Sequence, residues 1–168
     1  EHAIRDATLA GVALAPEVRA RFAEISVELS ALSNAFASAV LDATDAWSEH
    51  VTDEAVLAGL SPSDKAMFAS AAQTRGLDGW LVTLQLPSVS AVLTFAEDRG
   101  LRERVYAAFG TRASDMGPNA GQFDNSDRMA RIVALRREGA ALLGFADPVE
   151  WSLATKMAAN AGEVLTFL

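Results

Sequence analysis

The segment PEVRARFAEISVELSALSNAFASAVL, residues 16–41, decides the fold class, because its apolar residues recur at helical spacing. Those residues follow one another at intervals of three or four and are Val18, Phe22, Ile25, Leu29, Leu32 and Phe36. The intervals place them on one face of an α-helix, and Pro16 is a residue type favoured in a first helical turn. The segment therefore predicts a long helix that ends around residues 42–45. A coiled coil would also suit the stripe, but packing within a bundle is favoured because nothing beyond Leu41 continues the heptad.

Two short segments further along the chain alternate between apolar and polar residues, which is typical of half-buried β-strands. The first covers residues 47–52 and the second residues 80–86. We expect them to pair as a small antiparallel ribbon. A short helix from about Asp53 and a longer helix over residues 62–74 should lie between them in sequence. Two strands alone are only marginally stable, so the ribbon must pack against helices.

Helix start and stop signals divide the remaining sequence into further helices. Ser61, Pro62 and Asp64 combine an N-cap, a proline in the first turn and an acidic third residue. Further N-caps are expected at Asp98, at Asp124 or Asn125, at Asp147 and at Asn160. Gly144 followed by Phe145 is typical of a helix C-terminus. These signals predict a mainly α, multi-helix, bundle-like single domain over residues 1–168 with a small two-stranded β-ribbon.

Buried faces can be assigned to two of the later helices. The first is predicted to bury Leu101, Val105, Tyr106 and Phe109, and the second Met129, Ile132, Val133, Leu135 and Leu142. Gly139 falls inside the second of these helices, where a glycine costs about 1 kcal/mol relative to alanine. The three tryptophans are interpreted as core anchors, and the arginines at 104, 131, 136 and 137 as solvated surface residues.

Composition excludes several classes of protein. The 168 residues carry a formal net charge of −8, which argues against a nucleic-acid partner, because phosphate contacts need clustered Lys and Arg. Polar residues interrupt every apolar run before it reaches the length of a membrane span. The chain has no cysteine, which excludes disulfides and suits a reducing cytoplasm. Because the sequence starts at Glu1 and its last helix has only just begun at Leu168, we expect it to be a fragment.

No catalytic or metal-binding residue is predicted in this chain. The only histidines are His2 and His50, and a catalytic zinc site needs three protein ligands. His50 is interpreted as a surface or edge-strand residue. Four carboxylates that lie close in sequence, those of Asp42, Asp45, Asp53 and Glu54, are better explained by helix termination and capping than by a metal site. No G-x-S-x-G elbow accompanies Ser48 and His50, so a serine triad is not indicated.

The run TRASDMGPNAGQFDN, Thr111–Asn125, is the least regular part of the sequence and requires a specific loop. It could be a tight, internally hydrogen-bonded connection in which Arg112 pairs with Asp115, while Asn119, Asp124 and Asn125 bond to backbone groups. It could also line a substrate channel or brace another lobe. A phosphate cradle is a third hypothesis, weakened because the loop lacks the Gly-Lys-Ser/Thr ending of a P-loop.

Four segments together resemble the thimet oligopeptidase-like zinc peptidases, the family marked by H-E-x-x-H. They are Thr111–Asn125, Leu41–Trp47, Gly79–Ser88 and Ser152–Ala158, and the resemblance extends from about Leu14 to Leu168. The resemblance implies a largely helical enzyme with two lobes beside a deep channel for short peptides. It also implies that zinc and its glutamate lie in a C-terminal part, while this chain belongs to the N-terminal lobe that forms the opposite wall.

The hypothesis that follows is a non-catalytic piece of a cytoplasmic zinc oligopeptidase that is inactive on its own. The full-length enzyme would bind zinc and short peptides, this chain would bind no metal, and its partner would be the missing catalytic lobe. Neither nucleic acid nor a membrane is expected as a partner. Arg112, Asp115, Asn119, Asp124 and Asn125 are the candidate channel or inter-lobe residues. The alternatives are a stand-alone helical protein-interaction domain and a small anion-binding module.

Overall fold

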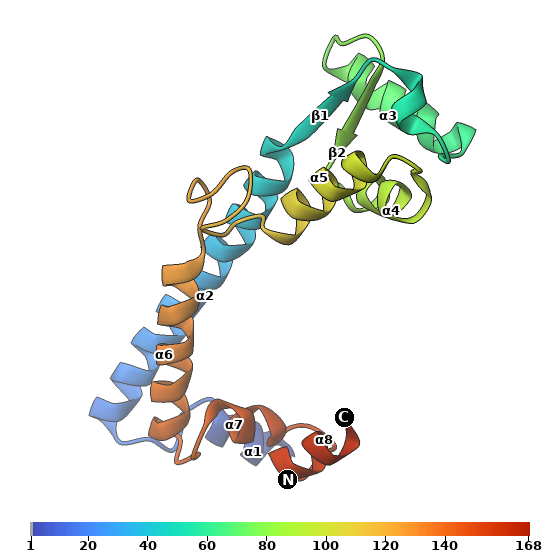
Figure 1. The fold of residues 1–168 in the computed structure, drawn as a ribbon. Helices are drawn as coiled ribbons and strands as arrows, with labels where there is room; N and C mark the ends of the chain where they lie inside the picture. The colour runs from blue at the N-terminus through green and yellow to red at the C-terminus, as the bar shows by residue number, and fades with distance from the viewer. Residues whose placement is uncertain (1) are drawn as a thin grey trace. The chain divides into compact units, whose positions relative to one another are not determined.

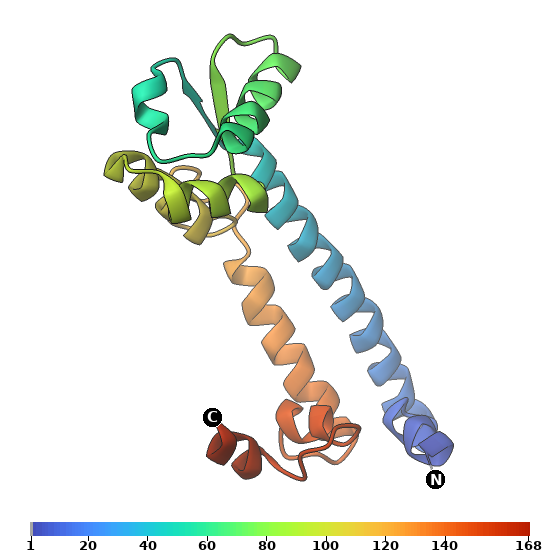
Figure 2. The same cartoon turned by 90° about the vertical axis from the view of Figure 1, so that its right-hand side faces the viewer.

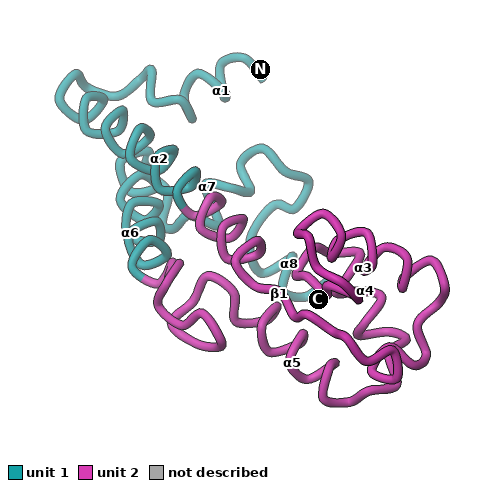
Figure 3. Tube along the Cα trace, turned by 90° about the horizontal axis from the view of Figure 1, so that it is seen from above, with its two compact units in different colours: residues 1–35, 127–168 teal, residues 36–126 magenta. Residues whose placement is uncertain are grey.

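The computed structural model describes residues 2–168, which fall into two compact units (Figure 3). Unit 1 comprises the residues up to 35 together with 127–168, and unit 2 comprises 36–126. The elements, in chain order, are α1 (His2–Leu9), α2 (Pro16–Ala46), β1 (Ser48–Val51), the 3-10 helix η1 (Glu54–Leu57), α3 (Pro62–Thr74), β2 (Trp80–Thr83), α4 (Leu86–Phe95), α5 (Arg99–Gly110), α6 (Ser126–Leu142), α7 (Pro148–Leu153) and α8 (Ala161–Phe167) (Figure 1). The predicted class, mainly α with one small two-stranded antiparallel sheet, is confirmed. That residues 1–168 form a single domain stays a prediction.

Unit 2 is built around the predicted ribbon. Strands β1 and β2 pair antiparallel, with Ser48 opposite Thr83 and Val51 opposite Trp80, and η1 and α3 lie between them in sequence. Helices α3 and α4 pack against β2, and α5 packs against α4 (Figure 2). The apolar core gathers side chains from all of these elements, among them Leu57, Phe68, Val82, Val92 and Leu101. The helices thus supply the cover that a two-stranded sheet needs.

Strand β2 is shorter than its sequence pattern predicts. It ends at Thr83, and α4 begins at Leu86 with Pro87 in its first turn. The buried hydroxyl of Ser88 accepts a hydrogen bond of 3.0 Å from the Thr83 backbone N–H, so that donor is satisfied after the ladder ends. The change from strand to helix therefore occurs within the segment that alternation alone assigned to one strand.

Unit 1 is formed by α1, the first part of α2, and α6 to α8. Its buried apolar side chains are Phe22 and Ile25 of α2 and Leu135 and Ala140 of α6. The rings of Phe22 and Trp151 are 5.9 Å apart and inclined at 54°. Gly139 faces the same tryptophan, and a Cβ at that position would make a tight contact of 3.3 Å with Cζ3 of Trp151. The glycine that costs helix propensity in sequence is thus a packing position in the structure.

The predicted caps at Ser61, Asp98, Asp147 and Asn160 are present, and the cap expected at Asp124 or Asn125 stays a prediction. Ser61 and Asp64 form a capping box, and Asp98 accepts from the Leu101 N–H at 2.5 Å. Asp147 accepts from the N–H groups of residues 149 and 150, and Asn160 from that of residue 163. Gly144 has φ +83°, and the Phe145 N–H donates to the Ala140 carbonyl at 2.9 Å, which is a Schellman helix end.

Three residues assigned to buried helix faces are exposed instead. Tyr106 is 71% exposed, and Met129 and Val133 are 46% and 52% exposed. The buried residues of these helices are Leu101, Val105 and Ala108 in α5 and Leu135, Gly139 and Ala140 in α6. Within the described residues, no helix is both long and apolar enough to cross a membrane.

Candidate functional site

The side chains present do not fit a zinc site. Within residues 2–168, no three His, Cys, Asp or Glu side chains form a group that could hold a metal ion. His50 is exposed, and its Nε2 lies 2.6 Å from the backbone carbonyl of Asp78. The Ser48 hydroxyl accepts a hydrogen bond from Arg75 at 3.1 Å. These two residues therefore make separate contacts.

Three of the four carboxylates that lie close in sequence make structural contacts. Asp53 caps η1 by accepting from the Ala55 N–H at 2.9 Å. Glu54 forms an ion pair with Lys65 at 2.8 Å. Asp45, in the last turn of α2, accepts from the Gln85 amide at 2.8 Å. Asp53 is thus a helix cap as expected, whereas Glu54 and Asp45 contact side chains of other elements.

The loop of residues 111–125, which we call the 111–125 loop, is closed by its own backbone. The Gly121 N–H donates to Ser114 O at 3.0 Å, and the Asn125 N–H donates to Ala113 O at 3.1 Å. Gly117 has φ +80°, and a Cβ there would lie 1.8 Å from the Thr111 hydroxyl oxygen, so only glycine fits. The loop is therefore a defined structure, as its unusual composition predicts.

Two of the five candidate residues, Arg112 and Asn119, line one small hollow in unit 2. Its cavity volume is about 10 Å³, far below the roughly 300–1,000 Å³ of typical ligand pockets. The Arg112 guanidinium lies 3.7 Å from the ring centre of Phe109, and its Nη1 donates to the Phe109 carbonyl at 3.3 Å. Asp115 is exposed and makes no ion pair with Arg112 within the described chain, so that suggested pairing is wrong.

The remaining two candidates lie where the 111–125 loop joins α6. Asp124 accepts from the N–H and the hydroxyl of Ser126, at 2.9 and 2.7 Å. Asn125 is buried, with 1% of its surface exposed, and its amide donates to the Phe36 carbonyl of α2 at 3.2 Å. Both residues thus fix the loop to neighbouring helices, and a role in a substrate channel stays a prediction.

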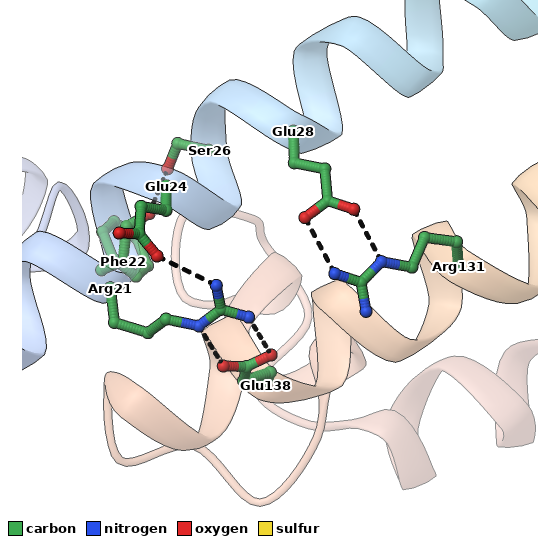
Figure 4. Close-up of polar contacts among 7 residues, drawn as sticks. All are labelled: Arg21, Phe22, Glu24, Ser26, Glu28, Arg131 and Glu138. Carbon is green, nitrogen blue, oxygen red and sulfur yellow. Dashed lines mark hydrogen bonds and ion pairs between the residues drawn. The ribbon is translucent and has the colours of Figure 1, made fainter.

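A pair of ionic contacts between α2 and α6 was missed by the sequence analysis (Figure 4). Arg21 binds both carboxylate oxygens of Glu138, at 2.6 and 2.9 Å, and also pairs with Glu24 at 3.1 Å. Arg131, interpreted above as a solvated residue, binds both oxygens of Glu28 at 2.6 and 2.9 Å. These hydrogen bonds lower the pKa of Glu138 and of Glu28.

A signal for these contacts exists in the sequence. Arg21 and Glu28 are seven residues apart on one helix, and Arg131 and Glu138 are seven apart on the other. A spacing of seven places both members on one helix face. Because each helix carries its arginine first, antiparallel packing brings each arginine opposite a glutamate. Arg104 is also paired, with both oxygens of Glu49, and no comparable spacing signals that contact.

Comparison with known proteins identifies relatives of the whole chain. The model of peptidase family M3 matches residues 92–168. Over all 168 residues the chain is 48% identical to oligopeptidase A of Escherichia coli (strain K12), and it spans about a quarter of that protein's length. It is 41% identical over 165 residues to a probable cytosolic oligopeptidase A of Arabidopsis thaliana, covering 94% of this chain and 23% of the relative.

The similarity is not confined to the oligopeptidases A. The chain is 34% identical over 161 residues to a dipeptidyl carboxypeptidase of Salmonella typhimurium, which involves 95% of this chain and 23% of that protein. The match to oligopeptidase A also includes residues before Leu14, where the sequence resemblance was expected to begin. The chain is similar to peptidase family M3 over residues 92–168, and all of it is similar to a part of oligopeptidase A.

Proposed function

We propose that this chain is a non-catalytic part of a zinc-dependent oligopeptidase and that it forms a wall of the channel for short peptide substrates. The observation that carries the proposal is its identity of 48% to oligopeptidase A over every residue, although it spans a quarter of that relative. At that level of identity, we expect the longer polypeptide that would contain these residues to hydrolyse oligopeptides, as the name of the relative indicates.

The side chains support a division of labour within that polypeptide. A hydrolytic zinc ion activates a water molecule and polarises the scissile carbonyl, and it needs three protein ligands. Since the described residues provide no such set, the ligands would come from the rest of the polypeptide. This chain would then contribute shape and surface charge, and the isolated 168 residues would be inactive.

The 111–125 loop is suited to line a channel because its backbone hydrogen bonds fix its conformation. A binding wall must hold its shape if it is to orient a flexible peptide, and preorganised surfaces lose less entropy on binding. Asp115 and Met116 are exposed on this loop, and Asn119 is partly exposed. These side chains are the ones that would contact a peptide. Arg112, Asp124 and Asn125 would hold the loop in position.

A cytoplasmic location is part of the proposal. The chain contains no cysteine, as suits a reducing compartment, and one plant relative is described as probably cytosolic.

The test is peptide hydrolysis by the longer polypeptide encoded by the gene. Asp115→Ala and Asn119→Ala should raise KM several-fold and leave kcat nearly unchanged, because a channel wall supplies binding and no chemistry. Gln73→Ala, an exposed position of α3, is the control. Unchanged KM in both loop variants would remove the channel role.

A second measurement tests the division of labour. A zinc chelator should abolish hydrolysis by the longer polypeptide, and the 168-residue chain should not hydrolyse the same peptide. Chelator-sensitive hydrolysis by the 168 residues alone would contradict the proposal. A stop codon directly after Leu168 would favour a stand-alone interaction domain.

A further inference from the structure

Unit 1 contains an open, mainly apolar groove, which we call the α7 groove. Its walls come from α1, α2, α6, α7 and α8, and its volume is about 1,350 Å³ including the solvent at its mouth. Leu29, Trp151, Leu153 and Val164 are among the apolar residues that line it. Helices α7 and α8 bury no residue in this chain, so their apolar side chains remain at least partly open to solvent.

The charge of the α7 groove is opposite to that of the chain. Among the described residues, the charged ones that line it are Arg136 and Lys156, and none of them is a carboxylate. The whole chain carries a net charge of −8. Lys156 donates to the Ser152 hydroxyl at 2.7 Å, and Arg136 forms no ion pair within residues 2–168. A segment that binds in this groove would therefore bind more tightly if it carried a carboxylate that could pair with Arg136 or Lys156.

Exposed apolar side chains continue beyond the groove. Val149 at its edge is 50% exposed, and Met157, Leu165 and Phe167 of the same region are 102%, 74% and 89% exposed. These side chains are close in sequence to residues that line the groove, and several exposed apolar side chains in one region are typical of a surface that other protein covers.

We propose that the α7 groove receives an apolar segment bearing at least one carboxylate, supplied by the remainder of the same polypeptide. This inference rests on the proposed function, because it needs a polypeptide longer than 168 residues. The bacterial relatives are about four times as long as this chain, so the remainder is large enough to supply such a segment. Val164 lies one helical turn before Leu168, so chain continuing from there would start beside the groove.

The first test measures the reactivity of single cysteines in the longer polypeptide. The described chain has no cysteine of its own, so Val149→Cys and Val27→Cys each introduce one reporter into this part. Val27 is a matched control, because it is also a valine of unit 1 and is 72% exposed, but it does not line the groove. Labelling by a maleimide, located by mass spectrometry, should be at least tenfold slower at position 149 than at position 27. Equal rates would overturn the inference.

The second test uses the charge of the groove. Arg136→Glu should lower the Tm of the longer polypeptide by several degrees, because it places a carboxylate against the carboxylate of the occupant. Arg137→Glu is the control, since it makes the same charge change at the adjacent residue of α6, which does not line the groove. Equal Tm values for the two variants would contradict the carboxylate in the occupant.

The outcomes separate this inference from the proposed function. Peptide hydrolysis with rapid labelling at position 149 would reject the groove occupant and retain the peptidase. Slow labelling that speeds up on dilution would mean that a second copy of the chain covers the groove, which also overturns the inference. Slow labelling without hydrolysis would reject the peptidase and retain the intramolecular contact.

Discussion

The two units of this chain are stabilised in different ways. Unit 2 has an apolar core to which both strands and helices η1 to α5 contribute. Unit 1 buries four apolar side chains, those of Phe22, Ile25, Leu135 and Ala140, and adds ion pairs between α2 and α6. Its helices α1, α7 and α8 bury none.

This difference indicates which part of the chain depends on further protein. A small apolar core provides little stability, because the free energy from burial grows with the area removed from water. Surface ion pairs add only a little more, since water and salt screen them. Unit 2 therefore has a core large enough to stabilise it alone. Unit 1 has a small core, and we expect it to gain stability when further protein covers its exposed apolar side chains.

The largest effect is expected in the core of unit 2. Phe68→Ala should reduce the free energy of unfolding by about 3–5 kcal/mol, because it removes a ring that is 1% exposed. Urea unfolding followed by circular dichroism measures this change. Phe22→Ala in unit 1 should cost less, since its ring packs in a thinner core. An equal cost for the two variants would break the comparison, and Tyr106→Ala, which is exposed, should stay within about 0.5 kcal/mol.

The next effect concerns the close packing of unit 1. Gly139→Leu should destabilise the chain by about 1–3 kcal/mol, because the added side chain meets Trp151 and Ile25. Thermal unfolding of the variant gives the size of the change. Gly110→Leu is the control, because a Cβ at that helix end meets no atom within 4 Å. Stabilisation by Gly139→Leu would show that unit 1 has room in its core.

The smallest effect concerns the ion pairs and depends on pH. The pKa of Glu138 is lowered by its hydrogen bonds to Arg21, so its contribution is complete above the ordinary glutamate pKa of about 4.3 and is lost as pH falls through its folded value. Glu138→Gln should therefore reduce the urea midpoint slightly at pH 6, and this difference from the native chain should shrink as pH falls below the ordinary glutamate pKa. Glu17→Gln on the same helix pair is the control. A difference that does not shrink as pH falls would mean that Glu138 acts through packing.

Much of the fold follows from the sequence because its signals are local. The capping box at Ser61 and the helix end at Gly144 depend on residues within one helical turn, and both are present as predicted. The pairing of β1 with β2 follows from alternation plus the need for helical cover. Such features need no knowledge of distant parts of the chain.

The errors arise where a distant residue decides the outcome. Tyr106 and Val133 have the right spacing for buried faces, but the neighbouring helices leave those positions exposed. From the sequence, Gly139 only lowers the helix propensity of its segment; in the structure it packs against Trp151, which is twelve residues further along the chain. Arg112 is an exception, because the residue that its guanidinium packs on, Phe109, lies only three residues before it in the sequence. The unusual composition of the 111–125 loop pointed to its candidate residues. Composition alone does not predict which atoms those residues contact.

The backbone hydrogen bonds that close the 111–125 loop should also make it resistant to proteolysis. Proteases cut segments that can be drawn out into an extended strand, and exposed loop tips are their usual targets. Here two cross-loop hydrogen bonds, at Gly121 and Asn125, must break before the tip can extend. Proteases that need an extended substrate should therefore cut the 111–125 loop slowly.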